Sequence, residues 1–304
     1  MIRMRRVPAT AALAVLVATL ATACSGPGGQ PAPAPAPASA GSCHAGVSGA
    51  ENWIMGSGEL SAAQAAGASS VRYAVGSAHL FVLLLRGQTS RAGQEVADFR
   101  SYAELKKMIR QGTIAPGIRW VMYDNEQWSL TPADEQADPV RYEQLFARLA
   151  HRQGYKVILA PAQDLVPGFD KNSFRAGQAV WPSYLSMGLA AASARAADIY
   201  EIQAQPYEMS VYRSQHAYAD FVAAAAAQAR AANPGIVIYA GLSTQRVSSA
   251  AQLLQDYEAT RHLVNGYWLN IPRHDQPGPP GLADQFLRTI PASASASAAT
   301  CAGA

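Results

Sequence analysis

The chain has 304 residues, of which 49% are hydrophobic and only 15% are charged. Three of its 24 basic residues, Arg3, Arg5 and Arg6, lie at the N-terminus, and without them basic and acidic residues are equal in number. The rest of the sequence has no basic cluster that would neutralise phosphates, so we expect no nucleic-acid partner.

Residues 1–23 have the pattern of a cleaved signal peptide. The arginines precede an apolar run, residues 11–23, that is shorter than the ~20 residues of a membrane-spanning helix. Residues 21–24 (ATAC) resemble a bacterial lipobox. This motif predicts lipidation of Cys24 and anchoring of the protein to the outer face of the cytoplasmic membrane. Plain secretion after cleavage nearby is the alternative.

Low-complexity segments flank the remainder of the chain. Residues 24–42 are rich in Pro, Ala and Gly and are typical of an extended spacer. Residues 291–304 form a second low-complexity segment, which carries Cys301. In an oxidising compartment Cys43 and Cys301 are expected to form a disulfide. The alternative is a free or intermolecular thiol.

Residues 43–290 are expected to form one domain. Their number is close to the ~250 residues of a typical (β/α)8 barrel. Short apolar runs rich in β-branched and aromatic residues alternate with longer helical patterns. The predicted strands are 79–85, 118–124, 155–162, 198–205, 235–242 and 265–271, with weaker candidates at 71–77 and 52–57.

Helical patterns fill the gaps between these strands. The segment 101–112 begins with Ser101 as a predicted N-cap and ends on Gly112. The segment 131–154 begins with Thr131 and Pro132 as the predicted N-cap and first helical residue, and Pro139 is expected to restart the helix. Further helices are predicted within 182–197, 214–235 and 248–263.

Apolar strands separated by helices indicate parallel pairing, and the fold class is therefore α/β. We expect a single-domain (β/α)8 TIM-like barrel. An open doubly wound sheet is the alternative, although no glycine-rich nucleotide-binding loop follows any predicted strand.

Polar residues gather where the predicted strands end, which is where active sites form in such barrels. They are Asp124, Glu126, Asp164, Glu201, Gln203, Gln205, Ser243, Thr244, Trp268 and Asn270. Because side chains alternate along a strand, Asp124 and Glu126 should share a face, as should Glu201, Gln203 and Gln205.

The pair Asp124 and Glu126 is accompanied by aromatic residues, among them Trp128. Two carboxyl groups beside aromatic surfaces are typical of glycoside hydrolysis, which needs a general acid and a second carboxylate. The alternative is a solvated acidic loop. For Glu201 and its two glutamines, the alternatives are a sugar-binding lumen and an internal hydrogen-bonded network.

Other catalytic patterns are missing from the sequence. The six histidines show no paired ligand spacing, so we expect neither a metal nor a cofactor. The segment around Ser243 lacks the second glycine of a G-x-S-x-G nucleophile elbow.

Five segments within 118–272 resemble a group of secreted actinobacterial proteins of unassigned activity: YDNEQWSLTPADEQADP, ILAPAQDL, YEIQAQ, ANPGIVIYAGLST and VNGYWLNIP. This resemblance implies a TIM-like barrel and no particular reaction. The chain is also distantly similar to family-18 glycoside hydrolases. Asp124 and Glu126 match the last two acidic positions of that family's D-x-x-D-x-D-x-E signature, whereas Arg119 and Met122 occupy the first two. Trp268 is compatible with the family's barrel-floor tryptophan.

The leading hypothesis is a glycoside hydrolase-like lipoprotein that acts on a cell-envelope or environmental polysaccharide. Glu126 would be the general acid, Asp124 would orient it or the substrate, and Glu201 would be a further carboxylate. The predicted sugar-binding residues are Gln203, Gln205, Trp268, Asn270, Trp128 and Asp164. The alternatives are a non-catalytic glycan-binding barrel and an envelope scaffold that contacts another protein.

Overall fold

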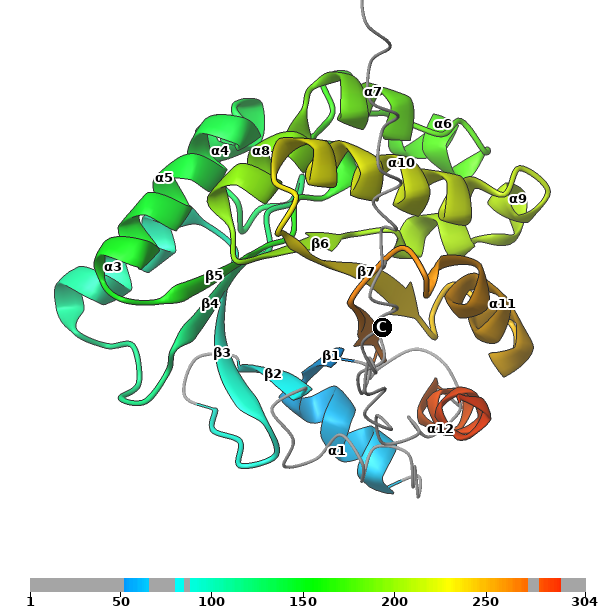
Figure 1. Cartoon of the computed structure of the whole chain (residues 1–304), viewed down its shortest axis with the longest axis horizontal. Helices are drawn as coiled ribbons and strands as arrows, with labels where there is room; N and C mark the ends of the chain where they lie inside the picture. Colours follow the sequence, from blue (N-terminus) through cyan, green and yellow to red (C-terminus); the bar gives the residue numbers. More distant parts are fainter. Residues whose placement is uncertain (1–51, 66–79, 85–87, 273–278, 291–304) are drawn as a thin grey trace, which may run out of the picture. The chain divides into compact units, whose positions relative to one another are not determined.

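Eight parallel strands form a closed barrel in the computed structural model, which describes residues 52–65, 80–84, 88–272 and 279–290 (Figure 1). The strands are β1 (Asn52–Gly56), β2 (Leu80–Leu84), β3 (Gln94–Phe99), β4 (Trp120–Tyr123), β5 (Lys156–Leu159), β6 (Ile199–Ile202), β7 (Val237–Ser243) and β8 (Gly266–Asn270). Each strand pairs with the next along the chain, and β1 pairs with β8. The expected (β/α)8 architecture is confirmed.

Helices cover the outside of the barrel (Figure 1). They are α1 (Ser57–Ala65), α3 (Tyr102–Gln111), α4 (Ala133–Ala137), α5 (Pro139–Arg152), α6 (Lys171–Arg175), α7 (Trp181–Ser186), α8 (Leu189–Ala196), α9 (Ser210–Arg213), α10 (Ala217–Ala232), α11 (Ala250–Thr260) and α12 (Pro279–Thr289). Two 3-10 turns, Gln163–Leu165 and Gln205–Glu208, follow β5 and β6.

Alternation along the strands produces two apolar faces. One set of side chains fills the barrel interior: Ile54, Phe81, Leu83, Val96, Met122, Ile158, Ala160, Ile199, Tyr239 and Trp268. The intervening residues point outward and pack on the helices, as Val121 and Tyr123 of β4 do against Phe146 of α5. The barrel is therefore a packed core, and ligands can reach only its ends.

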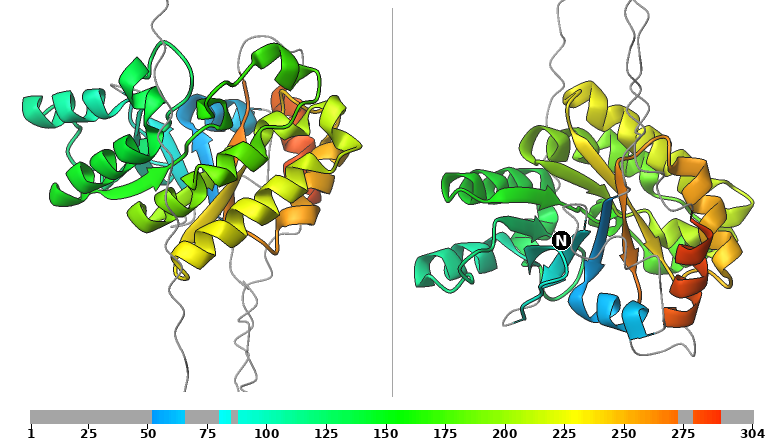
Figure 2. Two further views of the ribbon diagram at one scale, coloured as in Figure 1. Left: turned by 90° about the horizontal axis from the view of Figure 1, so that it is seen from above. Right: turned by 60° about the horizontal axis from the view of Figure 1, so that its bottom comes forward.

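The seam between β8 and β1 is covered by α12, which lies beside α1 (Figures 1 and 2). Phe286 of α12 packs edge-on against Trp53 of β1 and Tyr257 of α11. These contacts keep water from the outer face of the first and last strands.

Two expectations about the elements were wrong. The segment 94–99 forms β3, although the sequence predicts no strand there. By contrast, the weaker strand candidate at 52–57 is confirmed as β1. Thr131 does not cap a helix, because α4 begins at Ala133 with Pro132 at the N-cap. The Thr131 hydroxyl instead donates to the Arg100 carbonyl (2.8 Å) and accepts from Trp128 Nε1 (2.8 Å).

Helix α3 matches its prediction and carries an additional cap. The Ser101 hydroxyl accepts from Glu104 N, and Gly112 ends the helix in the left-handed conformation with φ 61°. The Glu135 carboxylate, which comes from α4, accepts from Tyr102 N (2.7 Å), Ala103 N (3.0 Å) and the Tyr123 hydroxyl (2.6 Å). A carboxylate at a helix N-terminus satisfies free amides and complements the helix dipole.

Several expectations lie outside the described residues: the signal peptide, the lipidated Cys24, the spacer, the Cys43–Cys301 disulfide and the weak strand at 71–77. None of the helices that the structure describes is long and apolar enough to span a membrane.

Candidate active site

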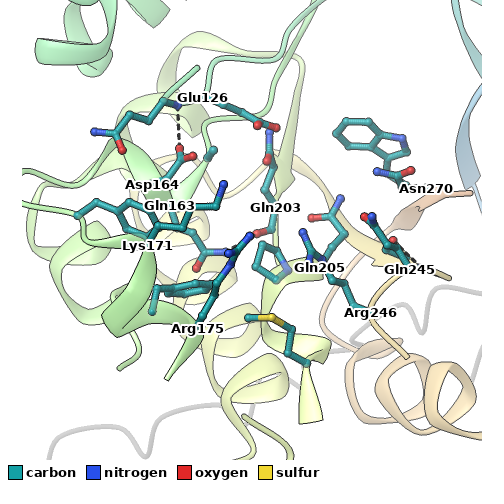
Figure 3. A pocket seen from close by; sticks show the side chains of 18 residues that line it. Glu126, Gln163, Asp164, Lys171, Arg175, Gln203, Gln205, Gln245, Arg246 and Asn270 are labelled. Atoms are coloured by element: carbon teal, nitrogen blue, oxygen red, sulfur yellow. Dashed lines mark hydrogen bonds between the residues drawn. The ribbon is translucent and has the colours of Figure 1, made fainter. Parts of the chain in front are cut away.

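The C-terminal ends of β4 to β8 surround a cavity of about 340 Å³ (Figure 3). This volume lies within the range of small-molecule sites. Six residues predicted from the sequence line it: Glu126, Asp164, Gln203, Gln205, Trp268 and Asn270. The other three predicted site residues, Asp124, Glu201 and Trp128, do not line this cavity.

Asp124 and Glu126 share the lumen side, as their spacing predicts. The strand ladder continues past β4, because Asp124 N donates to Phe99 O (2.9 Å) and Ala162 N donates to Asn125 O (3.0 Å). Alternation then places Asn125 on the outer side, where it is fully buried. Asp124 lies beneath the cavity and is 4% exposed, whereas Glu126 reaches the cavity wall.

Asp124 is bound by Gln203 from β6. Gln203 Nε2 donates to Asp124 Oδ1 (2.8 Å) and also to the Ala160 carbonyl (2.7 Å). Burial raises the pKa of Asp124 well above its ordinary range, and the neighbouring Glu126 carboxylate raises it further. Asp124 thus holds the amide of Gln203 in place at the cavity floor.

Glu126 and Asp164 are the two carboxyl groups on the cavity wall. Burial raises the pKa of Glu126 to about 7, the charge of Asp164 adds to the rise, and Arg100 opposes it. Asp164 Oδ1 accepts from Gln127 N (3.0 Å), which fixes the carboxylate beside the loop that carries Glu126. Burial also raises the pKa of Asp164. Glu126 can therefore exchange a proton with a ligand near neutral pH.

Amide side chains form the cavity floor. Gln203 and Gln205 are 7% and 8% exposed. Gln205 packs over Gly241 of β7, where an added Cβ would lie 2.1 Å from the Gln205 side chain. The Gln205 side chain can therefore lie against β7 only because residue 241 is a glycine. Asn270 at the end of β8 completes the polar floor.

Trp268 separates two hollows at this end of the barrel. Its ring borders the main cavity and a second one of about 320 Å³, which also contains Asp98 and Arg100 from the end of β3. Asp98 and Arg100 form an ion pair (2.8 Å). Trp268 is 9% exposed, and its Nε1 finds no hydrogen-bond partner among the described residues. Because Nε1 is buried, the indole can offer a ligand its apolar ring face.

Glu201 and Trp128 occupy less accessible positions. Glu201 faces the lumen one layer below Gln203 and is 0% exposed, with neither carboxyl oxygen hydrogen-bonded within the described part of the chain. Burial and the charge of Glu126 raise its pKa well above the ordinary range. Trp128 packs against the Arg100 guanidinium, 5.9 Å from the ring centroid.

Sequence reasoning missed the charged residues that come from short or unpredicted elements. Lys171 and Arg175 on α6 and Arg246 after β7 line the main cavity. Asp98 and Arg100 were missed together with β3. The N-cap at Ser101 could have indicated that strand, since a helix of a βα barrel follows directly on a strand. The described residues contain no group of acidic, His or Cys side chains that could hold a metal ion.

Comparisons with known proteins add little to this description. No family model matches the chain, and no curated protein matches it either. Among solved structures, a Schiff base-forming fructose-1,6-bisphosphate aldolase shares 12% sequence identity with it, with a TM-score of 0.39. The match covers 79% of this chain and 92% of the aldolase. A likeness at this level does not bear on the reaction or the substrate.

Proposed function

We propose that the chain is a glycoside hydrolase that acts on a cell-envelope or environmental polysaccharide. One observation carries the proposal: Glu126, whose pKa is raised to about 7, lies on the wall of an open cavity together with a second carboxyl group, Asp164. A general acid is most effective when its pKa lies close to the working pH.

In the proposed reaction Glu126 acts in its protonated form. It donates its proton to the glycosidic oxygen as the bond from that oxygen to the anomeric carbon breaks. A water molecule supplies hydroxide to the anomeric carbon, and its remaining proton passes to the Asp164 carboxylate. Proton transfer between the two acids and solvent then restores the starting state.

The remaining cavity residues would bind the sugar. The Gln203, Gln205 and Asn270 side chains can donate to and accept from hydroxyl groups, and Trp268 offers a surface on which a sugar ring can stack. Asp124 would act indirectly, by orienting Gln203. Glu201 lies below the floor, so the second carboxylate in this proposal is Asp164 and not Glu201.

The location of the protein belongs to the same proposal. Lipidation of Cys24 would anchor the chain at the outer face of the cytoplasmic membrane, and the spacer 24–42 would hold the barrel clear of the bilayer. A disulfide between Cys43 and Cys301 would join the two ends of the domain. Each of these follows from the sequence pattern alone.

The test is release of reducing ends from a panel of polysaccharides and peptidoglycan by the full chain. We expect Glu126→Gln to abolish release, since the amide cannot donate the proton. The matched control is Glu258→Gln, which changes a half-exposed carboxylate on α11 that pairs with Arg261. Release that survives Glu126→Gln would contradict the proposal. Binding without release, equal in wild type and Glu126→Gln, would instead support the non-catalytic glycan-binding alternative.

A further inference from the structure

Three cations line the main cavity. Lys171 and Arg175 come from α6, and Arg246 comes from the segment after β7. In Figure 3, Arg175 and Arg246 lie below Gln205, whereas Glu126 lies above Gln203. The three cations form a basic wall of the cavity, and the two acids lie within electrostatic reach of it, because Lys171 lowers the pKa of Asp164 and Arg246 lowers that of Glu126.

These cations have no ion-pair partner among the described residues. Other cations of the chain do: Arg100 pairs with Asp98, Arg213 with Asp256 and Arg288 with Asp284. Lys171 and Arg175 are four residues apart on one helix, so their side chains are neighbours of like charge. Neither cation forms an ion pair with an acid in the part of the chain that the structure describes, although Lys171 lies near enough to Asp164 to lower the pKa of that carboxyl.

The fold holds this basic wall in place. Phe174, between the two cations in sequence, is buried and packs against Tyr207 (centroids 5.6 Å apart) and Tyr212 (5.2 Å). Asp170 caps the start of α6 by accepting from Ser173 N (2.8 Å). A short exposed helix is thus fixed with its charges directed to the cavity.

The balance of charge in the cavity is positive. Three cations face two carboxyl groups, and Glu126 is neutral for part of the time at neutral pH because burial raises its pKa to about 7. The rest of the chain lacks this bias, since basic and acidic residues are equal once the N-terminal arginines are set aside. A concave site with a net charge of one sign attracts ligands of the other sign.

We propose that the basic wall formed by Lys171, Arg175 and Arg246 binds an anionic group, a carboxylate or a phosphate, carried by the sugar that occupies the cavity. This inference rests on the proposed function for the sugar and extends it to an acidic saccharide. The anion would contact the guanidinium and ammonium groups through charge-assisted hydrogen bonds. The neighbouring sugar ring would then lie across the amide floor toward Glu126.

The experiment measures binding of three probes to the full chain by calorimetry: a galacturonic acid trisaccharide, its neutral methyl ester and a hexose 6-phosphate. We expect at least one anionic probe to bind about tenfold or more tightly than the neutral ester, as charge-assisted contacts provide. The preferred anion distinguishes a carboxylate from a phosphate. Raising the salt concentration should reduce the preference.

Two variants locate the effect. Lys171→Gln/Arg175→Gln and, separately, Arg246→Gln should each lose most of the preference for the anionic probe. The matched control is Lys107→Gln/Arg110→Gln, which removes two exposed cations from α3, on the other side of the barrel (Figure 1). It should leave the preference unchanged. Equal binding of charged and neutral probes, absence of binding by both anionic probes, or an equal loss in the control would overturn the inference.

The outcome is separable from the proposed hydrolysis. Glu126→Gln should abolish cleavage and keep anion binding, because the anion is bound by the three cations, which this change leaves in place. Anion binding without cleavage of any polysaccharide would contradict the proposed hydrolysis and support the anion-binding site. Cleavage that depends on Glu126, with no preference for acidic saccharides, would support the proposed hydrolysis and contradict the anion-binding site.

Discussion

Gln203 of the β6 end donates both of its amide hydrogens across the barrel mouth, to Asp124 Oδ1 (2.8 Å) and to the Ala160 carbonyl (2.7 Å). This single side chain links the ends of β4, β5 and β6 at the floor of the cavity. The backbone carbonyl of Gln203 accepts from Gln163 Nε2 (3.2 Å), and the side chain of Gln203 lines the cavity, where its oxygen can accept from a ligand or from water.

Gln203→Ala should therefore destabilise the protein and disturb the site. The truncation leaves two buried acceptors unsatisfied, at a cost of about 2 kcal/mol or more in the free energy of unfolding. Urea unfolding measures this loss. Gln127→Ala, which truncates an exposed side chain of the neighbouring loop, should change stability by less than about 0.5 kcal/mol. Equal stability of Gln203→Ala and wild type would show that the link is unimportant.

The pH dependence of hydrolysis should follow Glu126. Its pKa is about 7 and its acidic form is the active one, so kcat/KM should fall about tenfold per pH unit above pH 7. The profile is measured with whichever polysaccharide the wild type cleaves. A rate that stays constant from pH 7 to pH 9 would exclude Glu126 as the acid.

Stability should decrease as the pH rises from mildly acidic to alkaline values. Burial raises the pKa of Asp98 and Asp256 to about 6 and that of Glu143 from an ordinary 4.5 to about 8. The folded chain then binds more protons than the unfolded chain across this window, and the free energy of unfolding falls as pH rises through it. Chemical denaturation at pH 5 and pH 8 measures the difference.

Glu143→Gln isolates one contribution. The amide can still accept from the Ser193 hydroxyl, which lies 2.7 Å from Glu143 Oε2. The slope of stability against pH between 4.5 and 8 should become shallower by up to about 1.4 kcal/mol per pH unit. Glu258→Gln on the surface should leave the slope as it is. An unchanged slope in Glu143→Gln would mean that this carboxyl is ionised in the folded protein.

Gly241→Ala tests the packing of Gln205. The new methyl group would lie 2.1 Å from the Gln205 side chain, which must swing away from β7. We expect a loss of about 1–3 kcal/mol in stability together with weaker sugar binding. Gln205→Ala removes the obstruction, so the double variant should bind sugar no worse than Gln205→Ala alone. Additive losses in the double variant would contradict this coupling.

The barrel and most of its polar mouth could be predicted from the sequence because strand order and side-chain alternation are local properties. The depth at which a side chain lies within the barrel could not be predicted in this way. Alternation correctly directs Glu201 to the lumen, but its pairing with Tyr239 of β7 places it in the packed interior layer. That position depends on the stagger of neighbouring strands, which a single sequence does not reveal.

The basic wall and β3 were missed for a different reason. Half of the residues of β3 (QEVADF) are polar, because four of its six residues are partly exposed. Lys171 and Arg175 belong to a five-residue helix in a long connection after β5. Short elements in long loops carry little periodic signal, and their position over the cavity is decided by the packing of Phe174.

Hydrogen bonds at three places hold the loop after β4, which carries Glu126. Asp124 N bonds to Phe99 O, the Thr131 hydroxyl bonds to Arg100 O, and Glu135 receives the first amides of α3. The segment that presents Glu126 is thus hydrogen-bonded to residues 99–103 on both sides of Glu126. We therefore expect Glu126 to keep the same position with and without substrate. Substitutions at 99–103 would then misplace Glu126 and slow catalysis, although none of these residues lines the main cavity.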